Sequence, residues 1–137
     1  MLERNIDVTL GTTNANSGIV HAGYNTAPGT LKAKFVDLGN KIIDDLSGPL
    51  NFTYNRCGAL VVARADGDNA AIDKMVAYSK EQGIPVEVWD EERLRKEEPH
   101  LAPNIKRALH APTAGVVIPY ELTLAAMQSC TASGVDL

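Results

Sequence analysis

The stretch from Thr12 to Tyr24 constrains this chain more than any other, because few structures accommodate its composition. Hydroxyl and amide side chains fill its first half. Gly18 and an apolar pair follow, and His21 begins its last four residues. Ser, Thr and Asn side chains bond to nearby backbone, and glycine permits tight turns and close approach. Long loops bind or cover a ligand, or they are solvated and disordered. Composition alone leaves both interpretations open.

A family resemblance favours the ligand-binding interpretation. The run Asn16–Tyr24, followed by Pro28–Lys34, resembles the flavin-contacting loop of FAD-dependent oxidoreductases of the D-amino-acid oxidase superfamily. Within that superfamily it is similar to the branch that holds L-2-hydroxyglutarate oxidase and anaerobic glycerol-3-phosphate dehydrogenase-like proteins. The similarity continues in four later blocks, so that it covers nearly the whole chain: Gly39-Asn40, Asn55–Val62, Glu98–Leu101 and Ala111–Val117.

The resemblance implies an enzyme that transfers a hydride from a small hydroxy acid or glycerol 3-phosphate to FAD. It places Glu3 at the position of the acid that bonds the ribose hydroxyls of the adenosine half. It implies that the loop supplies N–H groups and hydroxyls to the cofactor. The loop residues concerned are Thr12, Thr13, Asn16, Ser17 and Gly18.

His21 is the candidate general base, because it follows the flavin-type loop directly and an imidazole exchanges protons near neutral pH. The alternative is a structural histidine that hydrogen-bonds the loop. His100 and His110 lie beside prolines in expected turns and are weaker candidates. Arg56 and Tyr120 are further candidates for contact with a carboxylate or phosphate, although the sequence does not place them.

The resemblance also predicts that these residues are part of a longer, two-domain flavoprotein. No G-x-G-x-x-G turn, the phosphate loop of a Rossmann domain, occurs in the sequence. We therefore expect residues 1–29 to be a flavin-contacting segment and residues 30–137 to be a partial substrate-binding cap domain. The isolated chain is expected to be inactive and to bind no FAD. Hydrophobic surface that would meet the missing half offers a route to self-association.

One expectation and one alternative follow for the isolated chain. The segment Thr12–Tyr24 should be disordered, folded back on the domain, or held by a neighbouring copy. The alternative to a flavoenzyme fragment is a stand-alone α+β module for ligand binding or protein association.

Hydrophobic periodicity predicts four helices. The first covers residues 30–47, carries a stripe of large apolar residues, and is stopped by Gly48-Pro49. The stripe consists of Leu31, Phe35, Leu38, Ile42 and Leu46. Residues 70–82, capped by Asp68, form the second helix and turn Ile72, Met75, Val76 and Ser79 inward. Residues 91–97, capped by Asp90, and residues 120–133 form the third and fourth.

Strands are predicted near Phe52, Leu60, Val86, Lys106 and Val116. The connections 55–58 and 111–115 are too short for parallel crossovers, so the strands they join should not be parallel neighbours. The predicted fold class is therefore α+β, with a mixed, largely antiparallel sheet and helices packed on it. The last three residues, 135–137, resemble the opening of a further strand.

Composition excludes some other classes of protein. The formal net charge of −4 argues against nucleic-acid binding, and no apolar run approaches the length that spans a bilayer. Lys32 and Lys34 are expected to be solvated, with a role towards an acidic substrate as the alternative. Cys57 and Cys130 show no metal-ligand spacing and are expected to be buried free thiols. We expect a cytoplasmic protein that binds a small-molecule substrate, and peripheral membrane association of the full-length protein stays open.

Overall fold

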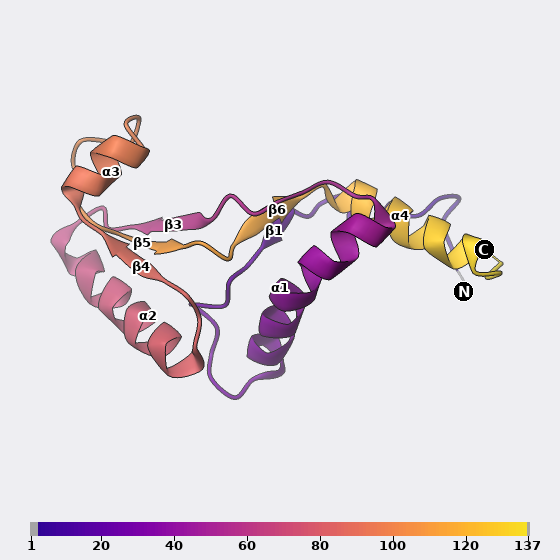
Figure 1. The fold of residues 1–137 in the computed structure, drawn as a ribbon, viewed down its shortest axis with the longest axis horizontal. Coiled ribbons are helices and arrows are strands. Elements are labelled where there is room, and N and C mark those ends of the chain that lie inside the picture. Colours follow the sequence, from indigo (N-terminus) through magenta and orange to yellow (C-terminus); the bar gives the residue numbers. More distant parts are fainter. Residues whose placement is uncertain (1–2, 137) are drawn as a thin grey trace.

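The computed structural model describes residues 3–136, which form an elongated molecule with a β-ribbon along its length (Figure 1). Two helices cover each end of the ribbon: α2 and α3 at one end, and α1 and α4 at the other. The helices are α1 (Leu31–Leu50), α2 (Asn69–Gln82), α3 (Glu91–Glu97) and α4 (Pro119–Ala132), with a short 3-10 turn, η1 (Asp66–Asp68), before α2. The strands are β1 (Ile19–Val20), β2 (Tyr54–Asn55), β3 (Ala59–Val62), β4 (Glu87–Trp89), β5 (Ala108–Ala111) and β6 (Gly115–Val117).

The strands form two three-stranded sheets, one in the order β1-β6-β2 and the other in the order β3-β5-β4. Every pairing among the described residues is antiparallel. The predicted α+β class is therefore confirmed, although two small sheets replace the one sheet that was expected. Strand β1 was not predicted.

The two sheets are two parts of one bent ribbon. The segment 54–62 runs antiparallel to the segment 108–117 through both sheets. Between the pairs Asn55–Val116 and Ala59–Ala111 the second segment carries one residue more than the first, which is a β-bulge. The short connections 55–58 and 111–115 therefore do not reverse the chain as hairpin turns do, but carry each strand from one sheet into the other.

Gly115 lies at the tightest point of this bulge. A Cβ atom there would come within 2.6 Å of the Asn55 carbonyl oxygen and 3.0 Å of the Arg56 Cα atom. Gly115→Ala is therefore expected to lower the free energy of unfolding by about 1–3 kcal/mol, as overpacking does. Gly67→Ala is the matched control, since no atom lies within 4 Å of the position that its methyl group would take. Urea unfolding of both variants is the measurement, and equal midpoints would contradict the prediction.

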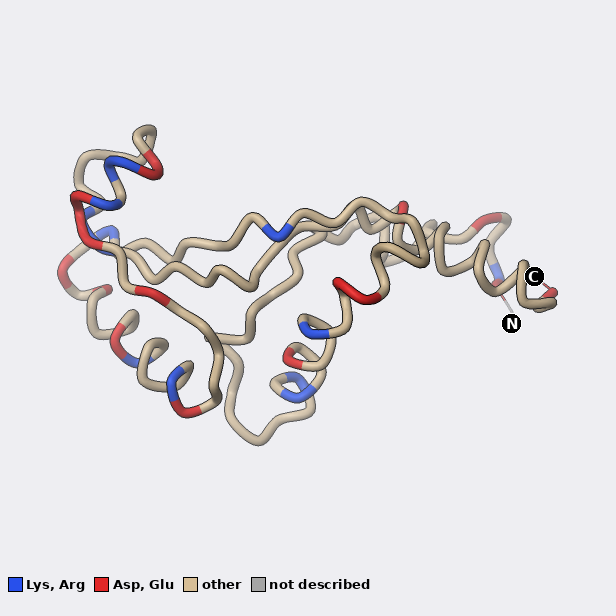
Figure 2. The backbone as a smooth tube through the Cα atoms, in the orientation of Figure 1, with Lys and Arg blue, Asp and Glu red and all other residues tan. Residues whose placement is uncertain are grey.

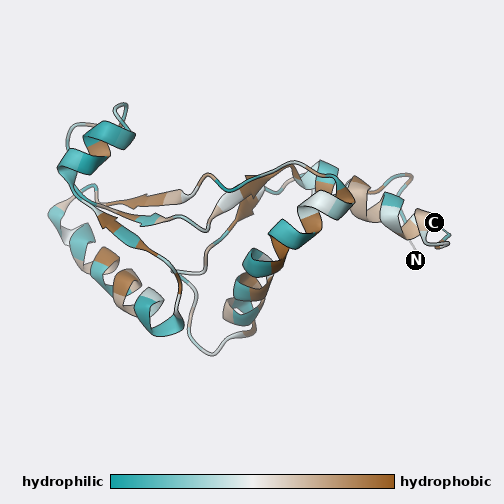
Figure 3. Ribbon diagram, in the orientation of Figure 1, coloured by the Kyte–Doolittle hydropathy of each residue, from teal (hydrophilic) through white to brown (hydrophobic). Residues whose placement is uncertain are grey.

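Helix α1 carries its apolar stripe outward. The five predicted residues are exposed by 38% to 72%: Leu31, Phe35, Leu38, Ile42 and Leu46. The residues that α1 buries are instead Asn40 and Ile43. Figure 3 shows hydrophobic positions recurring along α1. Periodicity placed the stripe correctly on one face, but no described residue covers that face.

The prediction that Gly48-Pro49 stops α1 is wrong. The helix continues through Pro49 to Leu50 and ends where Asn51 adopts the left-handed conformation, with φ of 54°. The N–H groups of Asn51 and Phe52 then bond back to the carbonyls of the last turn. Phe52 is only 6% exposed, so its burial fixes the end of the helix.

Helix α2 faces inward as predicted. Ile72 and Ser79 are buried, and Met75 and Val76 pack on the same cluster. Asp68 precedes the helix, but its carboxylate accepts hydrogen bonds from the N–H groups of Arg64 and Ala65 rather than from α2. Asp90 caps α3 as predicted, by accepting from the Arg93 N–H group.

Three smaller expectations concern Cys57, the last residues and membrane spans. Cys57 is exposed, which contradicts the prediction of a buried thiol, because it lies in the connection between β2 and β3. Val135 and Asp136 form no strand, and Leu137 lies outside the described residues. No helix within residues 3–136 is both long and apolar enough to cross a membrane.

The accessible surface of the chain is large for its mass. It measures 9119 Å², whereas a compact monomer of 14.7 kDa exposes about 6,900 Å². Figure 2 shows that the charged residues lie mostly on the helices and hardly at all along the ribbon. Large hydrophobic side chains such as Leu31 and Phe35 are exposed, so part of the surface is apolar.

Candidate functional site

The segment that begins with β1 is folded back on the domain, which was one of the three expected states. Ile19 and Val20 pair with Val116 and Gly115 of β6. Ala22 and Tyr24 are buried in a core cluster together with residues of α2 and β5. Burial raises the pKa of the Tyr24 hydroxyl, so this side chain stays neutral.

His21 lies between these anchored residues and points outward. Its side chain is exposed and has no hydrogen-bond partner among residues 3–136. Its backbone carbonyl, in contrast, accepts a hydrogen bond of 3.1 Å from the Asn40 side chain. The backbone of His21 is therefore held by Asn40, while its imidazole is exposed and forms no hydrogen bond to the loop within the described residues.

The residues before β1 form a chain of turns. The Ala15 and Asn16 N–H groups bond back to the carbonyls of Thr12 and Thr13, and the Asn16 side chain accepts from the Gly18 N–H group at 2.7 Å. The Gly18 carbonyl accepts from the Val117 N–H group at 2.8 Å. These bonds dock the loop against β6.

Gly18 is required by this docking. Its φ is +73°, and a Cβ atom would come within 2.2 Å of the Val117 carbonyl oxygen. The glycine is therefore explained by the close packing of two backbones, whatever else the loop contacts.

Three of the predicted cofactor residues line one hollow of about 320 Å³. Thr13, Asn16 and Gly18 form one side of it, and residues of β1, β6, α1 and α4 form the remainder. Its other lining residues are mainly apolar: Ile19, Val20, Ile43, Val117, Pro119, Leu122 and Thr123. The hydroxyls of Thr12, Thr13 and Ser17 have no hydrogen-bond partner among residues 3–136, so they are available to a ligand.

Glu3 is not among the residues that line this hollow. Its exposed carboxylate accepts two hydrogen bonds of 2.9 Å from Asn5, one from the backbone and one from the side chain. These bonds hold the pKa of Glu3 below its usual value. The structure does not bring Glu3 together with the loop residues.

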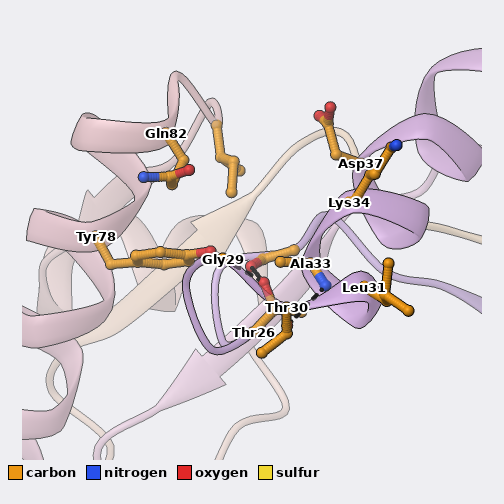
Figure 4. Close-up of a pocket in the computed structure, with 11 residues that line it drawn as sticks. Thr26, Gly29, Thr30, Leu31, Ala33, Lys34, Asp37, Tyr78 and Gln82 are labelled. Atoms are coloured by element: carbon orange, nitrogen blue, oxygen red, sulfur yellow. Dashed lines mark hydrogen bonds between the residues drawn. The ribbon is translucent and has the colours of Figure 1, made fainter.

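A second hollow, of about 380 Å³, separates the start of α1 from the end of α2 (Figure 4). Tyr78 and Gln82 face it from α2, Lys34 faces it from α1, and Thr30 faces it from the position just before α1. The Tyr78 and Thr26 hydroxyls lie 3.1 Å apart and bridge its floor. Lys34 has no ion-pair partner among the described residues, but nothing else at this hollow indicates a ligand.

The bulge of the ribbon holds a partly buried polar network that the sequence did not predict. Arg56 forms an ion pair with Asp44 and donates to the backbone carbonyls of Asn40 and Thr113. Its guanidinium also lies 5.4 Å from the centre of the Tyr54 ring. Arg56 therefore forms internal contacts in this structure.

The other candidates from the sequence are scattered. His110 stacks on Trp89 with ring centres 4.2 Å apart, and its Nδ1 atom lies 3.7 Å from the Glu87 carboxylate. His100 is exposed beyond α3, and Tyr120 is 46% exposed at the start of α4. None of them lines either hollow described above. Within residues 3–136 no group of His, Cys, Asp or Glu side chains is arranged to hold a metal ion.

Comparisons with known proteins agree with one another. The profile of the family described as FAD dependent oxidoreductase matches residues 1–137. A glycerol 3-phosphate dehydrogenase from Caloramator mitchellensis is 36% identical over 138 aligned residues, which cover 100% of this chain and 29% of that protein. A mitochondrial L-2-hydroxyglutarate dehydrogenase from Dictyostelium discoideum is 28% identical, over 85% of this chain and 26% of that protein.

Solved structures show the same fold. Glycine oxidase from Bacillus cereus superposes with a TM-score of 0.79 at 22% identity, over 90% of this chain and 34% of that chain. L-α-glycerophosphate oxidase from Mycoplasma pneumoniae, solved with FAD bound, superposes with a TM-score of 0.72 at 26% identity, over 85% of this chain and 33% of that chain. The chain thus spans about a third or less of the length of each of these proteins.

Proposed function

Since this chain belongs to the family of FAD-dependent oxidoreductases, we propose that it forms the flavin-facing and substrate-side portion of a dehydrogenase or oxidase. The substrate we propose is glycerol 3-phosphate or a small 2-hydroxy acid. Relatives that act on each of these two compounds match most or all of the chain. The free imidazole of His21 on a fixed backbone is the structural observation that carries the proposal.

The residues around the first hollow fit part of a flavin. Apolar side chains from β1, β6 and α4 form most of its lining, and Thr13 and Asn16 add polar groups. Ligand sites commonly combine an apolar lining with a few orienting polar groups. We propose that Thr12, Thr13, Asn16, Ser17 and Gly18 hold the cofactor here, and that Glu3 requires a rearrangement of its terminal segment to take part.

His21 would act on the proton of the substrate hydroxyl. The flavin, when bound, supplies the hydride acceptor. Oxidation of an alcohol carbon also releases the hydroxyl proton, and a ring nitrogen of His21 would accept it as general base. The carbonyl of His21 is held by Asn40, so the backbone that carries the base does not have to be ordered during the reaction.

The exposed stripe of α1 would meet the remainder of such an enzyme. We propose residues 1–29 as the flavin-contacting segment and residues 30–137 as part of the substrate-binding cap domain. Relatives are more than three times longer than the matched region, so they contain ample chain to cover the stripe. In the isolated chain the same stripe would promote self-association.

The isolated 137-residue chain is expected not to bind FAD or to oxidise substrate. A dinucleotide site needs a glycine turn at a helix N-terminus to receive the pyrophosphate, and none occurs in this sequence. Fluorescence titration of the purified chain with FAD is the test.

Stoichiometric binding at micromolar affinity would show that the loop region suffices, and the proposal of an incomplete site would be wrong. The positive control is the longer enzyme that carries these residues. That enzyme should bind FAD and oxidise glycerol 3-phosphate or L-2-hydroxyglutarate, and activity with neither compound would overturn the proposed substrate class.

A further inference from the structure

Asn40 is an unusual residue for the inner face of α1. It is only 8% exposed, and a buried amide is costly unless it is hydrogen-bonded. Its Nδ2 atom donates to the His21 carbonyl at 3.1 Å and to the Thr113 carbonyl at 2.8 Å. Both protons of the amide are therefore used, and the bonds join three segments that are distant in sequence.

Arg56 sets the orientation of this amide. Its guanidinium carries donors only, and Nη1 lies 3.4 Å from the Asn40 Oδ1 atom while Nη2 lies 3.1 Å from the Asn40 backbone oxygen. The amide oxygen must therefore face Arg56, which directs the amide nitrogen towards the carbonyls of His21 and Thr113. Asp44 holds the guanidinium from its other side.

We propose that Asn40, oriented by Arg56, is a positioning residue for His21. This inference rests on the proposed role of His21 as base. The imidazole has no bond of its own among residues 3–136, so the direction in which it leaves the backbone depends on the segment that carries it. Val20 and Ala22 fix that segment from the sides, through sheet pairing and core packing. The Asn40 amide, in contrast, contacts His21 itself, by donating to its backbone carbonyl.

The first test measures the position of His21 without any catalysis. In the 137-residue chain, Asn40→Ala is expected to raise the hydrogen-exchange rates of amides between Val20 and Thr26 on the order of 10-fold or more, because the segment loses its central bond. Asn104→Ala is the matched control. It removes an amide that also donates to a backbone carbonyl, that of Arg64, but far from His21 along the chain. Unchanged exchange in Asn40→Ala, or equal changes in both variants, would overturn the proposal.

Arg56→Lys is the second variant, in case Asn40→Ala does not fold. Lysine keeps the charge but lacks the planar fork that holds Asn40. It should raise exchange in the same segment by a smaller factor. Protection that stays at its original level in this folded variant would also contradict the proposal.

The second test uses turnover in the longer, FAD-containing enzyme. Asn40→Ala is expected to lower kcat on the order of 10–100-fold, with flavin content retained, since small displacements of a catalytic group have effects of this size. In a variant that already carries His21→Ala, Asn40→Ala should lower kcat less than about 2-fold. The reason is that the effects of two substitutions do not add when one residue acts through the other. Additive effects would show that Asn40 does not act through His21.

A His21→Ala variant with normal turnover would refute the proposed role of His21 as base. The hydrogen-exchange measurement would still decide whether Asn40 positions the His21 segment.

Discussion

Replacing His21 by alanine is expected to lower the turnover of the FAD-containing enzyme about 10²–10⁴-fold, the usual contribution of a general base. The imidazole is exposed and unbonded within the described residues, so its removal should not disturb the fold or the flavin content. Substrate oxidation in anaerobic single turnovers, together with the absorbance of bound flavin, is the measurement. Loss of activity with full flavin content is the result that the role as base requires.

His100→Ala is the matched control for this experiment. His100 is also exposed and, like His21, lines neither hollow, but it lies beyond α3, at the opposite end of the ribbon from α1 and α4. Its replacement should leave turnover within about 2-fold, since surface changes away from a site have small effects. A normal rate for His21→Ala, or an equal loss for His100→Ala, would remove His21 from the mechanism and leave it a surface residue.

Replacing Phe35 and Ile42 by lysine is expected to prevent self-association of the isolated chain. These residues are 62% and 49% exposed in the middle of the α1 stripe. Burial of one large apolar side chain contributes about 1.5–3 kcal/mol, so the loss of two should raise the dissociation constant about 10²–10⁴-fold. The excess of accessible surface over that of a compact monomer, about 2,200 Å², is large enough for a stable interface.

The matched control places lysine at two other exposed apolar positions, Ile6 and Val88, which are 101% and 45% exposed. The two double variants carry the same charge. Sedimentation velocity over a range of concentrations separates them: the α1 variant should be monomeric while the control still associates. The unsubstituted chain should associate at about 100 μM, a concentration far above the dissociation constants of specific interfaces. If it stays monomeric there, the prediction is contradicted.

Much of the fold could be predicted from local pattern. The inward residues of α2 and the capping of α3 by Asp90 followed from spacing and side-chain chemistry, because both are determined within a few residues. The outward stripe of α1 could not be predicted, since periodicity shows which residues share a face and not what covers it. The continuation of α1 through Pro49 depends on burial of Phe52, which is a tertiary contact.

The candidate site was predictable in part. The loop and His21 were found through their composition and resemblance, and the structure brings Thr13, Asn16 and Gly18 to one hollow. Whether these residues bind the flavin stays a prediction. The network of Asn40, Arg56 and Thr113 was missed, because Asn40 lies on the face of α1 opposite the apolar stripe, and that face is expected to meet solvent in an amphipathic helix. Its partners come from distant segments that only the bulge brings together.

The central place of β6 has a consequence for the order in which the chain can fold. β6 is the middle strand of its sheet, and both of its neighbours precede it, with Ile19 pairing to Val116, which is distant in sequence. Such contacts between distant positions form slowly. During synthesis, therefore, the segment that carries His21 has no partner strand until β6 has left the ribosome, after the residues of α1 and α2 have been made.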